Sequence, residues 1–187
     1  MGAKGDYAIN CGDQAANEIG GGPSSLSAGD SWPDCDSDAG KGKTPSSTCW
    51  GKTSDHTGVS FQRSEVSVSA VRDGDTQTLL AGEKYLDAND YETGDDKANN
   101  ESVYNGYDND NCRSTYYNAS SKIGRPPQQD RPGYSDTVSF GSAHSGSCNF
   151  VFCDGHVQAI GYSVDPLIFS RLGNRDDGIP VDLTRIP

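Results

Sequence analysis

The stretch FGSAHSGSCNFVFCDGHVQAIGYS, residues 140–163, predicts a β-hairpin and sets the fold class. Asp154-Gly155 is a preferred dipeptide of the two-residue type I′ turn, because both positions of that turn need a positive φ. With this turn at the tip, apolar residues pair across the two strands on one face: Phe152 opposite Val157, and Phe150 opposite Ala159. His156 would then lie on the other face, beside the tip. Turn chemistry therefore explains Asp154 without a catalytic role.

Patterns elsewhere predict a mostly β, or α+β, domain. Three further segments are rich in strand-forming residues: 6–9, 58–71 and 78–86. A short helix is predicted over 165–174, with Asp165 as N-cap, Pro166 at the first helical position and Gly173 at its end. We therefore expect an antiparallel β domain with long loops and a short C-terminal helix.

The length of the chain favours one domain. Its 187 residues are enough for a single core and barely enough for two, so we expect one globular domain over 1–187. Residues 1–5 are expected to be a disordered or added start. Residues 10–58 carry many turn formers and little periodicity, which predicts a long loop region.

Six cysteines, an even number, are typical of an extracellular domain with disulfides. Cys35 and Cys49 bracket a loop rich in Gly, Ser and Pro and are the best candidates for a bridge. Cys148 and Cys153 are not expected to bond to each other. On one strand they would point to opposite faces with Cα atoms roughly 16 Å apart.

The formal net charge of −12 excludes nucleic acid as a favoured partner, because like charges repel the phosphate backbone. The same charge attracts divalent cations, and it also keeps a secreted protein in solution; both explanations stay open. The sequence has no apolar run of 18 residues and no signal-peptide core. We therefore expect no membrane contact by this polypeptide.

The segment 87–112 is the most acidic and amide-rich part of the chain and is the best metal candidate. Calcium takes six to eight oxygen ligands from a flexible loop. The candidate ligands are six carboxylates: Asp87, Asp90, Asp95, Asp96, Asp108 and Asp110. No complete EF-hand order is present, so calcium binding and a merely solvated loop are both compatible with this composition.

Two sets of residues are weak catalytic candidates. His144, Asp154 and His156 could form a transition-metal or acid–base group, although a histidine bonded to backbone beside a Gly-rich bend explains His144 as well. Glu65 and Glu83 lie near predicted strands and are the first carboxylates to consider for a glycosidase. The nucleophile elbow G-x-S-x-G of esterases is absent from the sequence.

The hairpin stretch also resembles the His-x9-Asp-Gly signature of the DUF1559 family, the prepilin-like proteins of planctomycetes. His144 and Asp154-Gly155 match that spacing. His156 departs from the resemblance, because a small polar residue such as Ser is expected there. Further segments resemble the family in order along the chain: DYAINCGD (6–13), GPSSL (22–26), TGVSFQRSEV (57–66), GEKYL (82–86), QDRPG (129–133) and LGNRDDG (172–178).

This resemblance implies a β-rich globular part similar to type II secretion pseudopilins, here without their N-terminal hydrophobic helix. It implies an extracytoplasmic structural or binding role in a surface, filament or secretion assembly, with calcium as the one cofactor considered. The partners implied are other protein subunits or carbohydrate. The alternative function is a secreted hydrolase of polysaccharide or ester substrates that uses carboxylates or a His-centred site.

Overall fold

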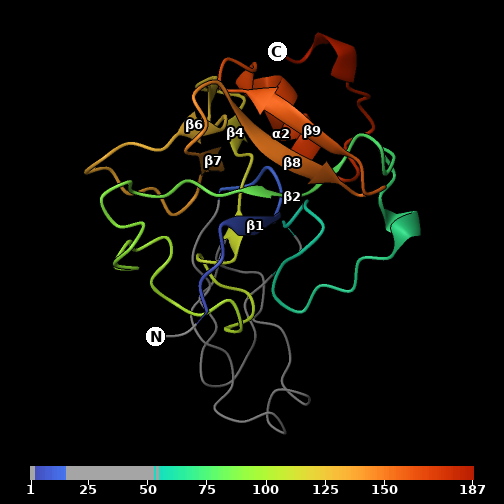
Figure 1. The fold of residues 1–187 in the computed structure, drawn as a ribbon. Coiled ribbons are helices and arrows are strands. Elements are labelled where there is room, and N and C mark those ends of the chain that lie inside the picture. The colour runs from blue at the N-terminus through green and yellow to red at the C-terminus, as the bar shows by residue number, and fades with distance from the viewer. Residues whose placement is uncertain (1–2, 16–52, 54) are drawn as a thin grey trace, which may run out of the picture.

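A mixed five-stranded sheet organises the computed structural model, which describes residues 3–15, 53 and 55–187 (Figure 1). In spatial order its strands are β3 (Cys112–Arg113), β1 (Tyr7–Asn10), β2 (Leu79–Glu83), β8 (Ser147–Phe152) and β9 (Val157–Gly161). β1 runs parallel to β3, and the other neighbours are antiparallel. The predicted fold class, mostly β or α+β, is confirmed.

Smaller elements surround this sheet. The short strands form two pairs: β4 (Tyr117–Asn118) with β5 (Ile123–Gly124), and β6 (Gln128–Gln129) with β7 (Gly141–Ser142). The helices of the described residues are the 3-10 helix η1 (Val68–Ala70), the α-helix α2 (Pro166–Gly173) and the 3-10 helix η2 (Leu183–Arg185). The predicted helix and its cap are confirmed, because the Asp165 carboxylate accepts hydrogen bonds from the N–H groups of Leu167 and Ile168.

The hydrophobic core lies where α2 packs against the sheet, beside β8 and β9 (Figure 1). Strand β8 buries alternate residues, as a half-buried strand should. The rings of Phe140, Phe150 and Phe169 pack edge to face, with centroids 5.2–6.2 Å apart. Gly82 makes room for this packing, because a Cβ atom there would lie 2.4 Å from the Phe150 ring.

The hairpin is confirmed, but its predicted register is wrong by one residue. Val151 pairs with Val157, and the Phe152 N–H donates to the His156 carbonyl, so the loop has three residues, 153–155. Gly155 takes a φ of 90°, which suits a turn that closes with a bulge. The predicted apolar face is therefore right on β8, where Phe150 and Phe152 are buried, and wrong on β9, where Val157 is exposed and Ile160 is buried instead.

The segment 58–71 was predicted as a strand, and that prediction is wrong. It forms turns followed by η1, and Val68 is 79% exposed. Alternating β-branched residues indicate a local preference for extended backbone, but a strand also needs the edge of a neighbouring strand with which to pair. The predicted strands at 6–9 and 78–86 are confirmed as β1 and β2.

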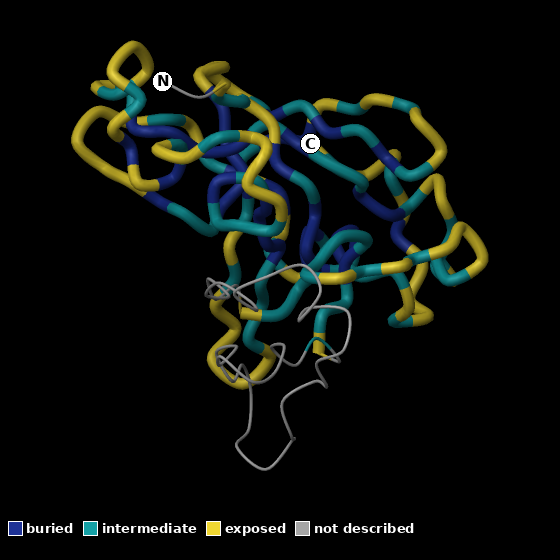
Figure 2. Tube along the Cα trace, turned by 90° about the horizontal axis from the view of Figure 1, so that it is seen from below, coloured by how far each residue is buried: buried dark blue, intermediate teal, exposed yellow. Residues whose placement is uncertain are grey.

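Buried polar side chains hold the segment from 84 to 139, here called the loop region. Figure 2 shows that buried stretches and exposed turns alternate along the described chain. Arg113 is fully buried and donates only to carbonyl groups, those of Ala98, Asn109, Cys112 and Ser139. Lys84 is also buried and donates to the Asn99 side chain and to the Asp110 carbonyl.

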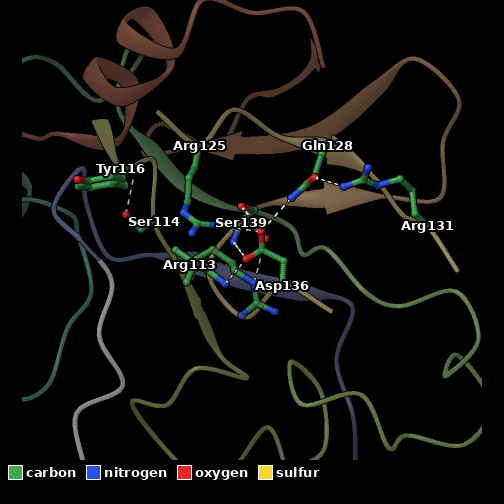
Figure 3. A network of polar contacts seen from close by, with 9 residues as sticks. Arg113, Ser114, Tyr116, Arg125, Gln128, Arg131, Asp136 and Ser139 are labelled. Atoms are coloured by element: carbon green, nitrogen blue, oxygen red, sulfur yellow. Dashed lines mark hydrogen bonds and ion pairs between the residues drawn. The ribbon is translucent and has the colours of Figure 1, made fainter. Parts of the chain in front are cut away.

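Asp136 is the second anchor of the loop region. Its carboxylate accepts from Arg125, Gln128 and the Ser139 hydroxyl, all at 2.9–3.0 Å, and Figure 3 shows these side chains pointing toward it. It also accepts the backbone N–H groups of Val138 and Ser139. Burial alone would raise the pKa of Asp136, but these hydrogen bonds and the Arg125 charge outweigh burial and lower the pKa.

Some predictions fall outside the described residues or are not tested by the structure. Cys35, Cys49 and most of the long loop 10–58 lie outside the described part, and the single domain over 1–187 stays a prediction. In the described part, Cys148 and Cys153 are free thiols. No helix of the described residues is both long and apolar enough to span a membrane.

Candidate functional site

Two of the weak catalytic candidates, His144 and Glu83, lie in contact. His144 stands in the bend between β7 and β8, and Glu83 ends β2. The imidazole Nε2 lies 3.3 Å from Glu83 Oε1, with the histidine side chain 60% exposed and the glutamate side chain 14% exposed. A carboxylate in this position can orient an imidazole or stabilise its protonated form.

Neighbouring residues fix the geometry of this pair. Asn149 on β8 donates to the other Glu83 oxygen through its backbone N–H, at 2.7 Å, and through its side-chain amide, at 3.1 Å. The Tyr162 hydroxyl, which follows β9, donates to the carbonyl groups of Ser142 and His144. Asn149 therefore fixes the Glu83 carboxylate, and Tyr162 fixes the bend that carries His144.

The described surroundings of the pair lack an activated nucleophile. The Cys148 thiol contacts the Glu83 carbonyl, but burial and then the Glu83 carboxylate raise its pKa well above the ordinary value. A catalytic cysteine needs a lowered pKa, so Cys148 is a structural thiol. Burial also raises the pKa of Tyr162 to about 12, which keeps its hydroxyl protonated as a donor.

The other candidate histidine, His156, belongs to the hairpin tip. His156 Nδ1 lies 2.6 Å from Asp154 Oδ1, and the His156 ring stacks on Phe152 with centroids 4.3 Å apart. The backbone N–H of His156, followed by its side chain, lowers the pKa of Asp154. The structure thus pairs the two histidines with different carboxylates, and Glu65 is exposed on a segment that forms no strand.

Most of the predicted calcium ligands serve the backbone of the loop region. Asp87 accepts the N–H groups of Asn89 and Gly133. Asp96 accepts those of Asp87 and Ala98, and also the Ser135 hydroxyl. Carboxylates engaged in this way stabilise turns, as Asx turns do. This use explains why an amide-rich acidic segment folds without regular structure.

Three of the remaining candidates make fewer side-chain hydrogen bonds than Asp87 and Asp96. Asp110 is 1% exposed; one of its oxygens accepts the Glu101 N–H, and the other, Oδ1, has no hydrogen-bond partner. Burial raises the pKa of Asp110. Asp108 accepts the Asp110 N–H, and Asp90 accepts the Thr93 hydroxyl.

A shallow cavity of about 460 Å³ is lined by Asp90, Asp95 and Asp96 together with Arg125 and Asp136. Its lining therefore combines acidic and basic side chains. Within the part of the chain that the structure describes, no three His, Cys, Asp or Glu side chains converge as a ready metal site. Calcium binding by this region stays a prediction.

Sequence reasoning missed the residues that position the His144–Glu83 pair. Asn149 alternates with the buried Cys148 and Phe150, which marks it as outward-facing but does not reveal its partner. Asp130 was also missed; it accepts from the Tyr91 hydroxyl and the Leu86 N–H, and burial raises its pKa. These contacts span about 40 to 65 residues, and local patterns carry no signal for them.

The fold and this site define a small β domain with a His–Glu pair beside strand β8 of its β8–β9 hairpin. Residues 12–167 match the family described as "Protein of unknown function (DUF1559)". The match covers most of the chain, which therefore belongs to this family. No curated protein and no solved structure matches the chain.

Proposed function

We propose that the chain is an extracytoplasmic, pseudopilin-like structural or binding domain of a surface or secretion-associated assembly. Its loop region recognises other protein subunits, and bound calcium orders that region. Membership of the DUF1559 family is compatible with this role but does not specify it.

One observation carries the proposal: the loop region exposes large aromatic and apolar side chains on a backbone fixed by buried polar groups. Tyr104 is 86% exposed, and Tyr91, Val103 and Tyr134 are also exposed. Aromatic residues are enriched in protein interfaces, and a fixed backbone lowers the entropy cost of binding. Arg113 and Asp136 supply this fixation.

Site-specific photo-crosslinking in cells that produce the full-length protein tests the binding role. With a photoreactive amino acid at Tyr104, we expect discrete adducts of higher mass that contain one partner protein. The matched control is the same substitution at Val157, which is 68% exposed at the hairpin and is expected to give none. Equal labelling at both positions, or no adduct at Tyr104, would contradict the proposal; a glycan adduct would redirect it to carbohydrate.

Calcium binding is tested by melting the protein with calcium and with a chelator. The unpartnered Asp110 Oδ1 and the neighbouring Asp108 are the oxygens best suited to a hard cation. We expect calcium to raise Tm by several degrees. Asp108→Asn should abolish the rise, whereas Glu65→Gln, an exposed acid outside the loop region, should preserve it. An unchanged wild-type Tm would remove calcium from the proposal.

The alternative function is a secreted hydrolase, and the contact between His144 and Glu83 is the observation that favours it. An enzyme using this pair should lose hydrolysis of polysaccharide or ester substrates in both His144→Ala and Glu83→Gln. His156→Ala is the matched control, because it removes a histidine that is paired with a different carboxylate. Activity that survives both changes would exclude the pair as the catalytic group.

A further inference from the structure

Two cysteines from distant parts of the chain meet where β1 leaves the sheet beside β3. The parallel register places Cys112 opposite Ile9. Side chains alternate along a strand, so Cys11, two residues after Ile9, points to the same face as Ile9 and Cys112. The Cys11 N–H donates to the Arg113 carbonyl and extends the ladder past both cysteines.

The two thiols are buried and interact with each other. Cys11 is 0% exposed and Cys112 is 7% exposed, and each thiol shifts the pKa of the other. The Tyr107 side chain interacts with both. Cys11 Sγ also donates to the Arg113 carbonyl, 3.1 Å away. Both cysteines are free thiols in this structure.

The two thiols differ in acidity. The interaction with Cys11 and then, against the effect of burial, the Arg113 charge lower the pKa of Cys112. The same interaction together with burial raises the pKa of Cys11. In a dithiol that exchanges with disulfides, the thiol of lower pKa is the one that attacks.

Cys112 is also the thiol that borders a cavity. A cavity of about 330 Å³ lies against it and is lined by Ile9, Ser60, Phe61, Arg63, Ser64, Gly106, Tyr107, Asn111 and Cys112. Cys11 does not line this cavity. The attacking thiol therefore borders the cavity, and the second thiol lies behind it.

We propose that Cys11 and Cys112 form a disulfide that ties the end of β1 to β3 and the start of the chain to the loop region. This modification site is independent of the proposed binding role and goes beyond it. The bond encloses about a hundred residues, a loop length for which a disulfide strongly restricts the unfolded chain.

The chemistry balances with a low-molecular-weight disulfide, such as oxidised glutathione, as the oxidant. The Cys112 thiolate attacks one sulfur of the oxidant, breaks its S–S bond and releases one thiol. Cys11, losing its proton to solvent, then attacks the Cys112 sulfur and releases the second thiol. One oxidant disulfide is reduced to two thiols, and one protein dithiol is oxidised.

The test is peptide mapping of the full chain after equilibration in glutathione buffers of increasing oxidising strength, with free thiols trapped by alkylation. We expect a peptide linked through Cys11 and Cys112 that disappears on reduction, while Cys148 stays alkylatable after unfolding. The linked form should melt several degrees above the reduced form. This measurement needs no variant, so a folding defect cannot obscure it.

Matched variants then assign the effect. Cys112→Ser should abolish both the linked peptide and the dependence of Tm on the redox buffer, whereas Cys148→Ser should preserve both. Alkylation of Cys11 and Cys112 under every oxidising condition, or linkage of Cys11 to Cys35 or Cys49, would overturn the proposal. Failure of crosslinking at Tyr104 would leave the disulfide untouched, so the two proposals fail separately.

Discussion

The region of β2, β8, β9 and α2 and the loop region are stabilised by opposite means. The first buries phenylalanine rings against one another around Phe150. The second buries a guanidinium, an ammonium and a carboxylate, those of Arg113, Lys84 and Asp136. Apolar packing tolerates adjustments of shape, whereas a buried polar group costs free energy unless every partner is in place. The loop region should therefore have one specified shape and lose it when a single partner is removed.

The largest effect is expected in the hydrophobic region. Phe150→Ala removes a fully buried ring that contacts Phe140 and Phe169, and it should lower the free energy of unfolding by about 3–5 kcal/mol. Val157→Ala, on the exposed face of the same hairpin, should change it by less than about 0.5 kcal/mol. Urea unfolding measures both. Similar losses in the two variants would refute the assignment of the core.

This contrast also explains how much of the fold follows from sequence. The hairpin and α2 were predicted because local chemistry decides them, through Asp154-Gly155 and the Asp165 cap. The register was wrong because Asp-Gly fits turns of two and of three residues, and local preference does not choose between them. The pattern at 58–71 was misleading because a segment forms a strand only when the edge of another strand, distant in the sequence, lies beside it.

The polar anchors were not predicted, for a related reason. The partners of Arg113 are carbonyl groups in turns around Ala98, Asn109 and Ser139, and carbonyls have no signature in a sequence. His144 and Glu83 were each named as candidates, but their contact joins two elements 61 residues apart and depends on how β2 pairs with β8. The candidate residues could therefore be named from the sequence, but the sequence did not show which of their side chains come into contact.

Within the loop region, the largest of the remaining stability effects is expected at Asp136. Asp136→Asn weakens bonds to Arg125 and the Ser139 hydroxyl and should cost about 2 kcal/mol at neutral pH. The folded pKa lies below the ordinary 3.8, so this contribution is present above pH 3.8 and is lost as pH falls through the folded pKa. Urea unfolding should show the two proteins converging in acid; a constant difference would contradict the charge-based account.

Lys84 should also make stability rise with pH, but in the alkaline range. Burial, and then the Arg113 charge, lower its pKa from 10.5 to about 8. Between these values the unfolded chain binds more protons, so stability rises with pH. Relative to Lys84→Met, the wild type should gain about 1–2 kcal/mol between neutral pH and about pH 9.5. The difference between their urea unfolding curves measures this gain, and a flat difference would mean that the ammonium is well solvated.

The smallest effect is expected at His144. Its side chain is mostly exposed and pairs with Glu83 across 3.3 Å, so His144→Ala should cost no more than about 0.5 kcal/mol in urea unfolding. Asn149→Ala removes the hydrogen bond from the Asn149 side-chain amide to Glu83 Oε2. It should cost more, about 1 kcal/mol. The reverse order would show that His144 holds the bend by itself.

The most direct test of the central claim, that buried polar groups shape the loop region, is hydrogen exchange of Arg113→Met compared with wild type. Methionine keeps much of the side-chain volume but leaves the carbonyl groups of Ala98 and Ser139 without their donor. Amides of the loop region should exchange much faster, while those of β8 and β9 keep their protection. Unchanged exchange in the loop region, or equal acceleration in β8 and β9, would contradict the claim.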